Sequence, residues 1–304
     1  MLIWDFLRYH QTFNIGILGS VHQSASECVI LTIISLEDGL LKELSIIVCL
    51  KQVPETTEVK INPATNTLIR EGVDSIINPF DLYAIEEAVR IKERNGSGKI
   101  TALTMGPPQA ENALKDAIAS GCDEAVLVSD KAFAGSDTWA TSYTLAKAIE
   151  KIHRYDLIIC GRQALDGDTA QVGPGIACHL NIPQIMYVKK IEELNDSFIR
   201  VERMTEEGYE VIESPLPAVI AVVKEINEPR IPSLKGKLKD KKTQVICWKA
   251  DDLTFDKSKI GLDGSPTQVI KIFTPPPRKG GQILDGNLSE AVDTIYTFLK
   301  NEIL

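Results

Sequence analysis

The chain has 304 residues, of which 44% are hydrophobic and 25% are charged, as is ordinary for globular proteins. This length suits one large domain or two smaller ones. A formal net charge of −9 and an isoelectric point of about 5.1 argue against a nucleic acid as partner. The six cysteines and four histidines show no metal-ligand spacing. We therefore expect no metal site and a reducing, cytoplasmic setting.

The first 45 residues carry neither clear helical or strand periodicity nor good helix caps. Their apolar patches, at residues 13–18 and 28–36, are shorter than the roughly 18 residues that a membrane span requires. The basic start of a signal peptide is also absent, so we expect neither export nor direct membrane insertion. We interpret residues 1–45 as an N-terminal extension that arises from a translation start placed too far upstream. A genuine extra segment is the alternative.

From residue 46 to about residue 183, strand and helix patterns alternate. Strands are expected at residues 46–51, 99–105, 124–128 and 155–160. Helices are expected at residues 81–95, 109–120, 138–152 and 171–180. The first of these helices should carry Leu82, Ile85, Ala88, Val89 and Lys92 on one face, and residues 59–70 should form a hairpin excursion before it. The alternation predicts an α/β fold with a parallel, doubly wound, Rossmann-like sheet.

Beyond Pro183 the pattern changes to strands joined by short polar turns. We expect these extra antiparallel strands at residues 184–191, 198–204, 208–212 and 218–223. After Pro229 the chain is rich in proline, glycine and lysine, and a single helix at residues 289–303 closes it. Such an extended arm cannot bury much surface alone, so we expect it to lie on a partner.

The loop at residues 160–174 (CGRQALDGDTAQVGP) carries the strongest functional signal. It joins a buried strand to a helix, and the free N–H groups at a helix start favour a phosphate. Gly161, Gly167 and Gly173 permit positive φ and a close approach of a ligand to the main chain. Side-chain to backbone hydrogen bonds from Asp166, Asp168 and Thr169 are expected to hold the loop. An ordinary strand-to-helix connection is the alternative.

Other nucleotide motifs are absent or incomplete. Residues 96–99 (GSGK) resemble half of a P-loop, but the required earlier glycine is Glu93, so we interpret them as a turn. No G-x-G-x-x-G follows the strand at residues 46–51, which argues against a standard dinucleotide fold. ATP pyrophosphatases place a Ser-Gly-Gly loop after the first strand, whereas this chain has Gln52, Val53 and Pro54 there.

Five short motifs, in the same order along the chain, resemble the electron transfer flavoprotein β subunit. They are residues 48–54 (VCLKQVP), 78–81 (NPFD), 104–108 (TMGPP), the loop at 160–174 and residues 227–230 (NEPR) with the lysines that follow. The resemblance implies a nucleotide-binding α/β domain over residues 46–250, which includes a partner-recognition loop near residues 227–242. It also implies that residues 251–304 form a C-terminal arm that contacts an α subunit.

The family resemblance implies that this subunit binds an adenine nucleotide, and we expect FAD, with AMP as the alternative. Some relatives hold AMP as a structural plug. Others hold a second FAD and divide the electrons of NADH between a low-potential and a high-potential acceptor, which is electron bifurcation. AMP-binding members commonly carry a bulkier residue in the place of Gly167, so the loop is more similar to the FAD-binding group.

The implied nucleotide site falls on loops that follow strands or open helices, which meet at one edge of a parallel sheet. The cofactor-binding residues carried over are Cys49, Asn78, Pro79, Phe80, Asp81, Met105, Gly161, Arg162, Gln163, Ala164, Leu165, Asp166, Gly167, Asp168, Thr169, Ala170, Gln171 and Val172. None of these side chains has an obvious acid, base or nucleophile role, which suits chemistry carried by cofactors.

The implied docking residues are Leu234, Lys239 and Lys242 in a lysine-rich segment of an acidic protein. In the family a leucine among lysines docks redox partners such as acyl-CoA dehydrogenases, whereas most charge runs are simply solvated faces. Membership of the bifurcating group would add NADH and ferredoxin or flavodoxin as partners. A stand-alone nucleotide-sensing module is the alternative from a different class, and the long C-terminal arm argues against it.

Overall fold

The computed structural model describes residues 43–55, 61–62, 67–68, 75–270, 283–284 and 287–302, with backbone only for residues 61–62, 67–68 and 302. Most of the predicted N-terminal extension therefore lies outside the described residues. The chain divides into two units. The larger unit contains the described residues up to Gln268 except residues 61–62 and 67–68, so this packed unit continues past residue 250, where the sequence suggested that the arm begins. The smaller unit contains the hairpin of β3 (Ile61–Asn62) and β4 (Thr67–Leu68) and the helix α7 (Leu288–Glu302).

The larger unit is built on a nine-stranded sheet with the order β11-β10-β9-β12-β8-β1-β6-β7-β13. The strands β9, β12, β8, β1, β6, β7 and β13 run parallel, and β10 and β11 add an antiparallel edge. Their bounds are β1 (Ser45–Cys49), β6 (Lys99–Met105), β7 (Glu124–Val128), β8 (Leu157–Gly161), β9 (Gln184–Leu194), β10 (Phe198–Met204), β11 (Tyr209–Pro215), β12 (Ala218–Val222) and β13 (Ile246–Trp248). The predicted fold class is confirmed, and β13 is an additional strand.

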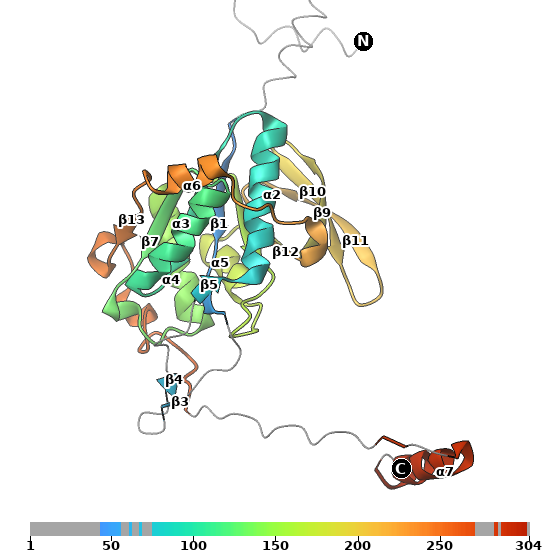
Figure 1. Ribbon diagram of the computed structural model, residues 1–304. Helices are drawn as coiled ribbons and strands as arrows, with labels where there is room; N and C mark the ends of the chain where they lie inside the picture. The colour runs from blue at the N-terminus through green and yellow to red at the C-terminus, as the bar shows by residue number, and fades with distance from the viewer. Residues whose placement is uncertain are drawn as a thin grey trace, which may run out of the picture. The chain divides into compact units, whose positions relative to one another are not determined.

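Helices cover both faces of this sheet (Figure 1). The helices α2 (Pro79–Asn95) and α3 (Glu111–Ser120) pack on one face, and α4 (Thr138–Ile152) and α5 (Val172–Leu180) pack on the other. The helix α6 (Leu234–Asp240) lies against α3. Shorter elements are the antiparallel pair β2 (Gln52–Pro54) and β5 (Ser75–Ile77) and the 3-10 turns η2 (Pro108–Ala110), η3 (Lys131–Phe133), η4 (Lys224–Ile226), η5 (Ala250–Asp252) and η6 (Lys257–Lys259).

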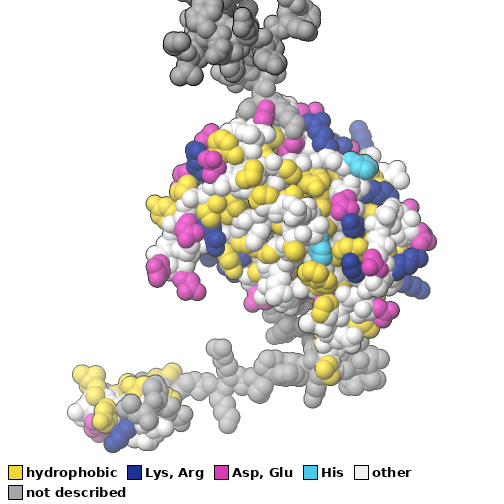
Figure 2. Space-filling view, turned by 180° about the vertical axis from the view of Figure 1, so that it is seen from behind, with side chains coloured by type: hydrophobic (Ala, Val, Ile, Leu, Met, Phe, Trp, Pro, Cys, Tyr) yellow, Lys and Arg dark blue, Asp and Glu magenta, His cyan; other side chains and the backbone are white. Residues whose placement is uncertain are grey.

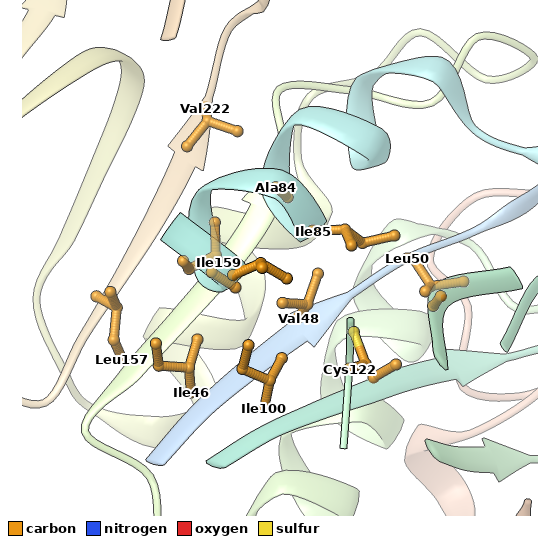
Figure 3. Close-up of a cluster of buried hydrophobic side chains, with 14 of the residues drawn as sticks. Ile46, Val48, Leu50, Ala84, Ile85, Ile100, Cys122, Leu157, Ile159 and Val222 are labelled. Atoms are coloured by element: carbon orange, nitrogen blue, oxygen red, sulfur yellow. The ribbon is translucent and has the colours of Figure 1, made fainter. Parts of the chain in front are cut away.

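The strand β1 shows why the sheet is doubly covered. Its side chains alternate between two hydrophobic clusters, with Ile46 and Val48 in the cluster under α2 and Ile47 and Cys49 in the cluster under α4 and α5. Figure 3 shows Val48 beside Ile85 of α2, with Ile46 near Ile100 of the neighbouring strand. A strand that is apolar on both faces is stable only in the middle of such a sheet. The central position of β1 then decides where a ligand site can form.

Candidate functional site

The strand order reverses between β1 and β8. From β1 the chain continues through β6 and β7 on one side of the sheet, whereas β8 and β12 lie on the other side. Ligands of open parallel sheets bind outside the carboxyl ends of the strands at such a switch point. A cavity of about 370 Å³ lies there, and its lining residues are Cys49, Leu50, Lys51, Asn78, Asp81, Met105, Ser136, Asp137, Thr138, Thr141, Leu145, Cys160, Gly161, Arg162, Gln163, Ala164, Gly167, Thr169, Ala170, Gln171, Val172 and Gly173. We call it the switch-point cavity.

The carboxylate of Asp81 joins the two strand ends at the switch point. It is 6% exposed and accepts hydrogen bonds from the backbone N–H of Lys51 (2.7 Å) and of Gly161 (3.2 Å). Burial raises its pKa to about 7, although these hydrogen bonds and the charge of Lys51 oppose the rise. A Cβ atom on Gly161 would lie 2.3 Å from Oδ1 of Asp81, so only glycine fits where β8 meets α2. The Asp81 side chain thus holds the start of α2 against the ends of both β1 and β8.

The side chain of Asn78 holds the loop at residues 161–172. This buried amide donates to the carbonyl of Gln163 (2.8 Å) and accepts from the N–H of Leu165 (3.0 Å). Hydrogen bonds from the side chains of Asp166, Asp168 and Thr169 to the backbone were expected to hold the loop, and the structure shows none of them among the described residues. Asp166 forms an ion pair with Lys51 Nζ (2.6 Å), and Asp168 accepts a hydrogen bond from the side chain of Gln163.

The backbone of this loop also differs from the prediction. Gly161, Gly167 and Gly173 do not adopt positive φ. Instead Asp168 (φ 51°) and Ala170 (φ 54°) are left-handed. Left-handed residues other than glycine are uncommon, and strain of this kind is concentrated at ligand sites. The space around Gly167 is open, because a Cβ atom there would meet nothing within 4 Å.

Two helix starts border the switch-point cavity. The helix α5 has no side-chain cap, and its first residues Val172 and Gly173 line the cavity. The helix α4 is capped by Asp137, which accepts from the N–H groups of Trp139 and Ala140. An uncapped helix start offers free N–H donors and partial positive charge to an anion. The α5 end of the cavity is therefore the place suited to a phosphate.

Most of the predicted nucleotide residues come together in this cavity. Its wall does not include Pro79, Phe80, Leu165, Asp166 or Asp168. The prediction missed the segment around Asp137 and residues Thr141 and Leu145, which enter from α4. A helix over residues 138–152 was expected, but no sequence signal places its start at the switch point. That proximity follows only from the strand order.

A second cavity of about 660 Å³ adjoins the first, and Arg162 lines both. Its lining residues are Phe80, Arg162, Tyr187, Arg203, Met204, Thr205, Glu206, Val223, Lys224 and Glu225. The Arg162 guanidinium lies 5.1 Å from the centroid of the Phe80 ring. Tyr187 has φ 62° beside a register shift between β12 and β9, and such a bulge redirects a side chain. Within the described residues, the buried Nε of Arg203 has no hydrogen-bond partner. We call this the arginine cavity.

The predicted recognition segment, residues 227–242, is anchored to α2 at its start. Arg230 forms ion pairs with Glu86 (2.7 Å) and Glu93 (2.6 Å). Burial disfavours the charge of Glu86, but hydrogen bonds from Arg230 and Arg90 outweigh burial and lower its pKa. The resemblance suggested a loop here, whereas residues 234–240 form the helix α6, which Ser233 caps.

The three predicted docking residues differ in their surroundings. Leu234 is 77% exposed and Lys242 is also exposed. Lys239 instead donates to the carbonyl of Cys122 (2.9 Å) and pairs with Asp123 (3.2 Å). Gly236 lies so close to α3 that a Cβ atom would be 2.0 Å from the carbonyl oxygen of Ala119. The helix α6 therefore exposes Leu234 at its start and contacts α3 and its following turn through Gly236 and Lys239, while the exposed Lys242 lies in the turn after the helix.

Two negative findings apply to the described part of the chain. No group of three or more His, Cys, Asp or Glu residues there could hold a metal ion. Among the helices that the structure describes, none combines the length and the apolar character needed to cross a bilayer.

The sequence matches proteins of one family. The electron transfer flavoprotein domain matches residues 65–253. An electron transfer flavoprotein subunit beta of Thermoanaerobacterium thermosaccharolyticum is 54% identical over 259 residues, which are 85% of this chain and 98% of the relative. The caffeyl-CoA reductase-Etf complex subunit CarD of Acetobacterium woodii is 46% identical and covers 85% of this chain and 99% of the relative. Protein FixA of Bradyrhizobium diazoefficiens is also 46% identical, over 76% of this chain and 83% of the relative. The resemblance that the motifs predicted is confirmed, and the chain belongs to the electron transfer flavoprotein family as a β subunit.

Proposed function

We propose that this chain is one subunit of a heterodimeric electron carrier and binds an adenine nucleotide in the switch-point cavity. The cavity has the size of a small-ligand site and an uncapped helix start for a phosphate. The buried polar side chains of Asn78 and Asp81 form hydrogen bonds with the backbone beside the cavity, which indicates a built site and not simple apolar packing. These contacts keep the nucleotide loop in position beside the cavity.

FAD is the nucleotide that we favour, because the switch-point cavity adjoins the arginine cavity. The first is suited to an adenosine phosphate, and the second has room and aromatic walls for the rest of a dinucleotide. The observation that carries this choice is Arg162, which lines both cavities. A flavin bound in the arginine cavity would supply electron transfer. Arg162 and Arg203 would face the negative charge of the bound dinucleotide. AMP remains the alternative, because it would fill the switch-point cavity alone.

The implied partners are an α subunit and redox enzymes. The helix α7 has exposed apolar side chains, among them Val292, Ile295 and Phe298, which suit a partner surface. On the face of the larger unit seen in Figure 2, charged side chains lie mainly along the rim and uncharged ones occupy the centre. We propose that the C-terminal arm and such a face contact the α subunit, and that Leu234 and Lys242 dock a dehydrogenase.

Acyl-CoA dehydrogenases are the dehydrogenases that we favour, and the similarity to a subunit of a caffeyl-CoA reductase complex supports a CoA-linked partner. For the FAD-binding form we add NADH as electron donor, ferredoxin or flavodoxin as acceptor, and electron bifurcation as the overall process. The described cysteines are all free thiols, which suits the cytoplasm.

The test is to co-purify this chain with its α subunit and to identify the nucleotides that denaturation releases. FAD in excess of the flavin held by the α subunit supports the FAD form. AMP in its place supports the alternative. The proposal would be contradicted if neither nucleotide is found. It would also be contradicted, in favour of a stand-alone module, if the chain purifies as a stable monomer that does not bind the α subunit.

A further inference from the structure

Cys49 and Cys160 form a pair of thiols in the wall of the switch-point cavity. They are register partners on the neighbouring parallel strands β1 and β8. Side chains at paired positions of parallel strands project to the same face, and both cysteines belong to the cluster under α4 and α5. Both line the cavity, and each is 7% exposed. The pair is therefore buried in the core on one side and open to the cavity on the other.

The remaining described cysteines lack this combination of features. Cys122 is completely buried and lines none of the described cavities, and Cys178 and Cys247 are exposed. Among the described cysteines, only Cys49 and Cys160 are paired with each other in the sheet. Most buried cysteines act as small hydrophobic residues. Two adjacent sulfur atoms that face an open cavity can additionally act as a bidentate ligand.

We propose that Cys49 and Cys160 form a two-thiol site for a soft, thiophilic group of the trivalent-arsenical class. Thiolate ligands select soft partners, and two of them on one rigid sheet need little reorganisation to bind one atom. With an arsenical oxide, each sulfur forms one bond to arsenic. The oxide oxygen leaves as water with the two thiol protons, and no atom is oxidised or reduced.

The surroundings of Cys160 fit this chemistry. The neighbouring Cys49 thiol and burial raise the pKa of Cys160 above its ordinary value, so binding an arsenical at this sulfur releases its proton. A Cβ atom built on Gly173, near the start of α5, would lie 3.8 Å from Sγ of Cys160. The partial positive charge of that helix start favours sulfur carrying negative charge.

An occupant held by both sulfurs would project its organic group into the switch-point cavity. The proposed nucleotide occupies the same space, so the two ligands should exclude each other. This second part of the inference rests on the proposed function, whereas the two-thiol site does not. The two parts can therefore fail separately.

The experiment treats the co-purified heterodimer with phenylarsine oxide and then washes it with an excess of a monothiol. The mass of this chain is measured next. Monothiols remove arsenic from isolated cysteines, while a two-thiol adduct persists until a dithiol such as dithiothreitol is added. We expect one persistent adduct that is lost in Cys49→Ser and in Cys160→Ser. The matched controls Cys178→Ser and Cys247→Ser should retain it. Protein loaded with AMP or FAD should react at least tenfold more slowly than nucleotide-depleted protein.

Peptide mapping gives a second readout that does not depend on the variants folding normally. In the unmodified chain the adduct should link the peptide of Cys49 to that of Cys160. An adduct that the monothiol removes, or one that survives in Cys49→Ser, would overturn the two-thiol site. Equal reaction rates with and without nucleotide would overturn the competition alone. An adduct on a heterodimer that never binds a nucleotide would leave the site standing and refute the proposed function.

Discussion

Replacing Gly161 with alanine tests how the switch point is built. The added Cβ atom would lie 2.3 Å from Oδ1 of Asp81, 2.6 Å from the carbonyl carbon of Phe80 and 2.8 Å from the N–H nitrogen of Asp81. Two of these three atoms are backbone in the first turn of α2, which cannot rotate away. Either β8 or the start of α2 must move, and both border the switch-point cavity.

The expected cost has two sources. Inserting a methyl group into a packed site costs about 1–3 kcal/mol. The displacement also weakens the hydrogen bond from the Gly161 N–H to Asp81, and such a bond contributes about 0.5–3 kcal/mol, depending on whether the carboxyl group is neutral or charged. Relaxation makes these terms less than additive, so we expect a loss of about 2–4 kcal/mol. For a domain of this size that loss lowers the unfolding temperature by roughly 4–16 °C.

The assay compares thermal unfolding and nucleotide content of the co-purified heterodimer carrying Gly161→Ala or Gly167→Ala. Gly167 is the matched control, because its Cβ atom would meet nothing within 4 Å and its φ is not positive. We expect a lower unfolding temperature and reduced nucleotide content for Gly161→Ala, and an unchanged unfolding temperature for Gly167→Ala. Similar unfolding temperatures for the two variants would refute the steric argument.

Three further predictions concern other parts of the larger unit. Arg230→Ala should destabilise the chain by about 2–3 kcal/mol in denaturant unfolding, because it leaves the buried Glu86 with only Arg90 as an ionic partner; an unchanged midpoint would contradict this. Leu234→Ala should slow electron delivery to the partner dehydrogenase without changing stability or nucleotide content, and unchanged partner kinetics would show that α6 does not dock it. Burial raises the pKa of Asp81 from 3.8 to about 7, so the folded chain binds a proton that the unfolded chain releases between these pH values. Its contribution to the free energy of unfolding therefore falls as pH rises from about 4 to about 7, by a few kcal/mol, and Asp81→Asn should flatten that part of the pH profile.

Periodicity predicted the regular elements well and the irregular ones poorly. The strands at residues 99–105 and 124–128 and the helix at residues 138–152 have the bounds that their patterns predicted. The strand β13 was missed because it has three residues and is paired only on one side, with β7. The helix α6 was missed because its seven residues include a glycine, which disfavours a helix locally. Packing of that glycine against α3 overrides the local preference.

The helix α2 shows a limit of pattern analysis. Its sequence placed Lys92 on one face with the apolar residues Leu82 and Ile85, but the structure buries Glu86 and Glu87 more deeply than Lys92. Two buried carboxylates in one turn contradict any hydrophobic pattern. They are tolerated because Arg90 and Arg94 on the same helix pair with them, and because Arg230 and Asn227, about 140 positions later in the chain, supply further hydrogen bonds. No local window of the sequence contains the two distant partners.

The sequence predicted which loops surround the candidate site, because family motifs mark those loops. It did not predict which further segments join them, because that depends on the order of the strands in the sheet. Family motifs gave the loops that surround the switch-point cavity, and the structure brings most of them together. The sequence did not predict that Asn78, and not the loop aspartates, holds the loop at residues 161–172. This contact requires the Asn78 amide to reach Gln163, which is 85 residues away in the chain. The left-handed conformation of Ala170 was also not predicted, because the glycines of the same loop were the residues expected to adopt positive φ.

One helix connects the two regions on which the proposed function depends. The start of α2 carries Asp81 at the switch-point cavity, and its later turns carry Glu86 and Glu93, which hold Arg230 at the start of the recognition segment. A helix of 17 residues is about 25 Å long. The loop at residues 161–172 and the start of residues 227–242 are therefore positioned against the same helix. A change at Arg230 should loosen the recognition segment while the Asp81 contacts persist, so the two regions can be perturbed one at a time.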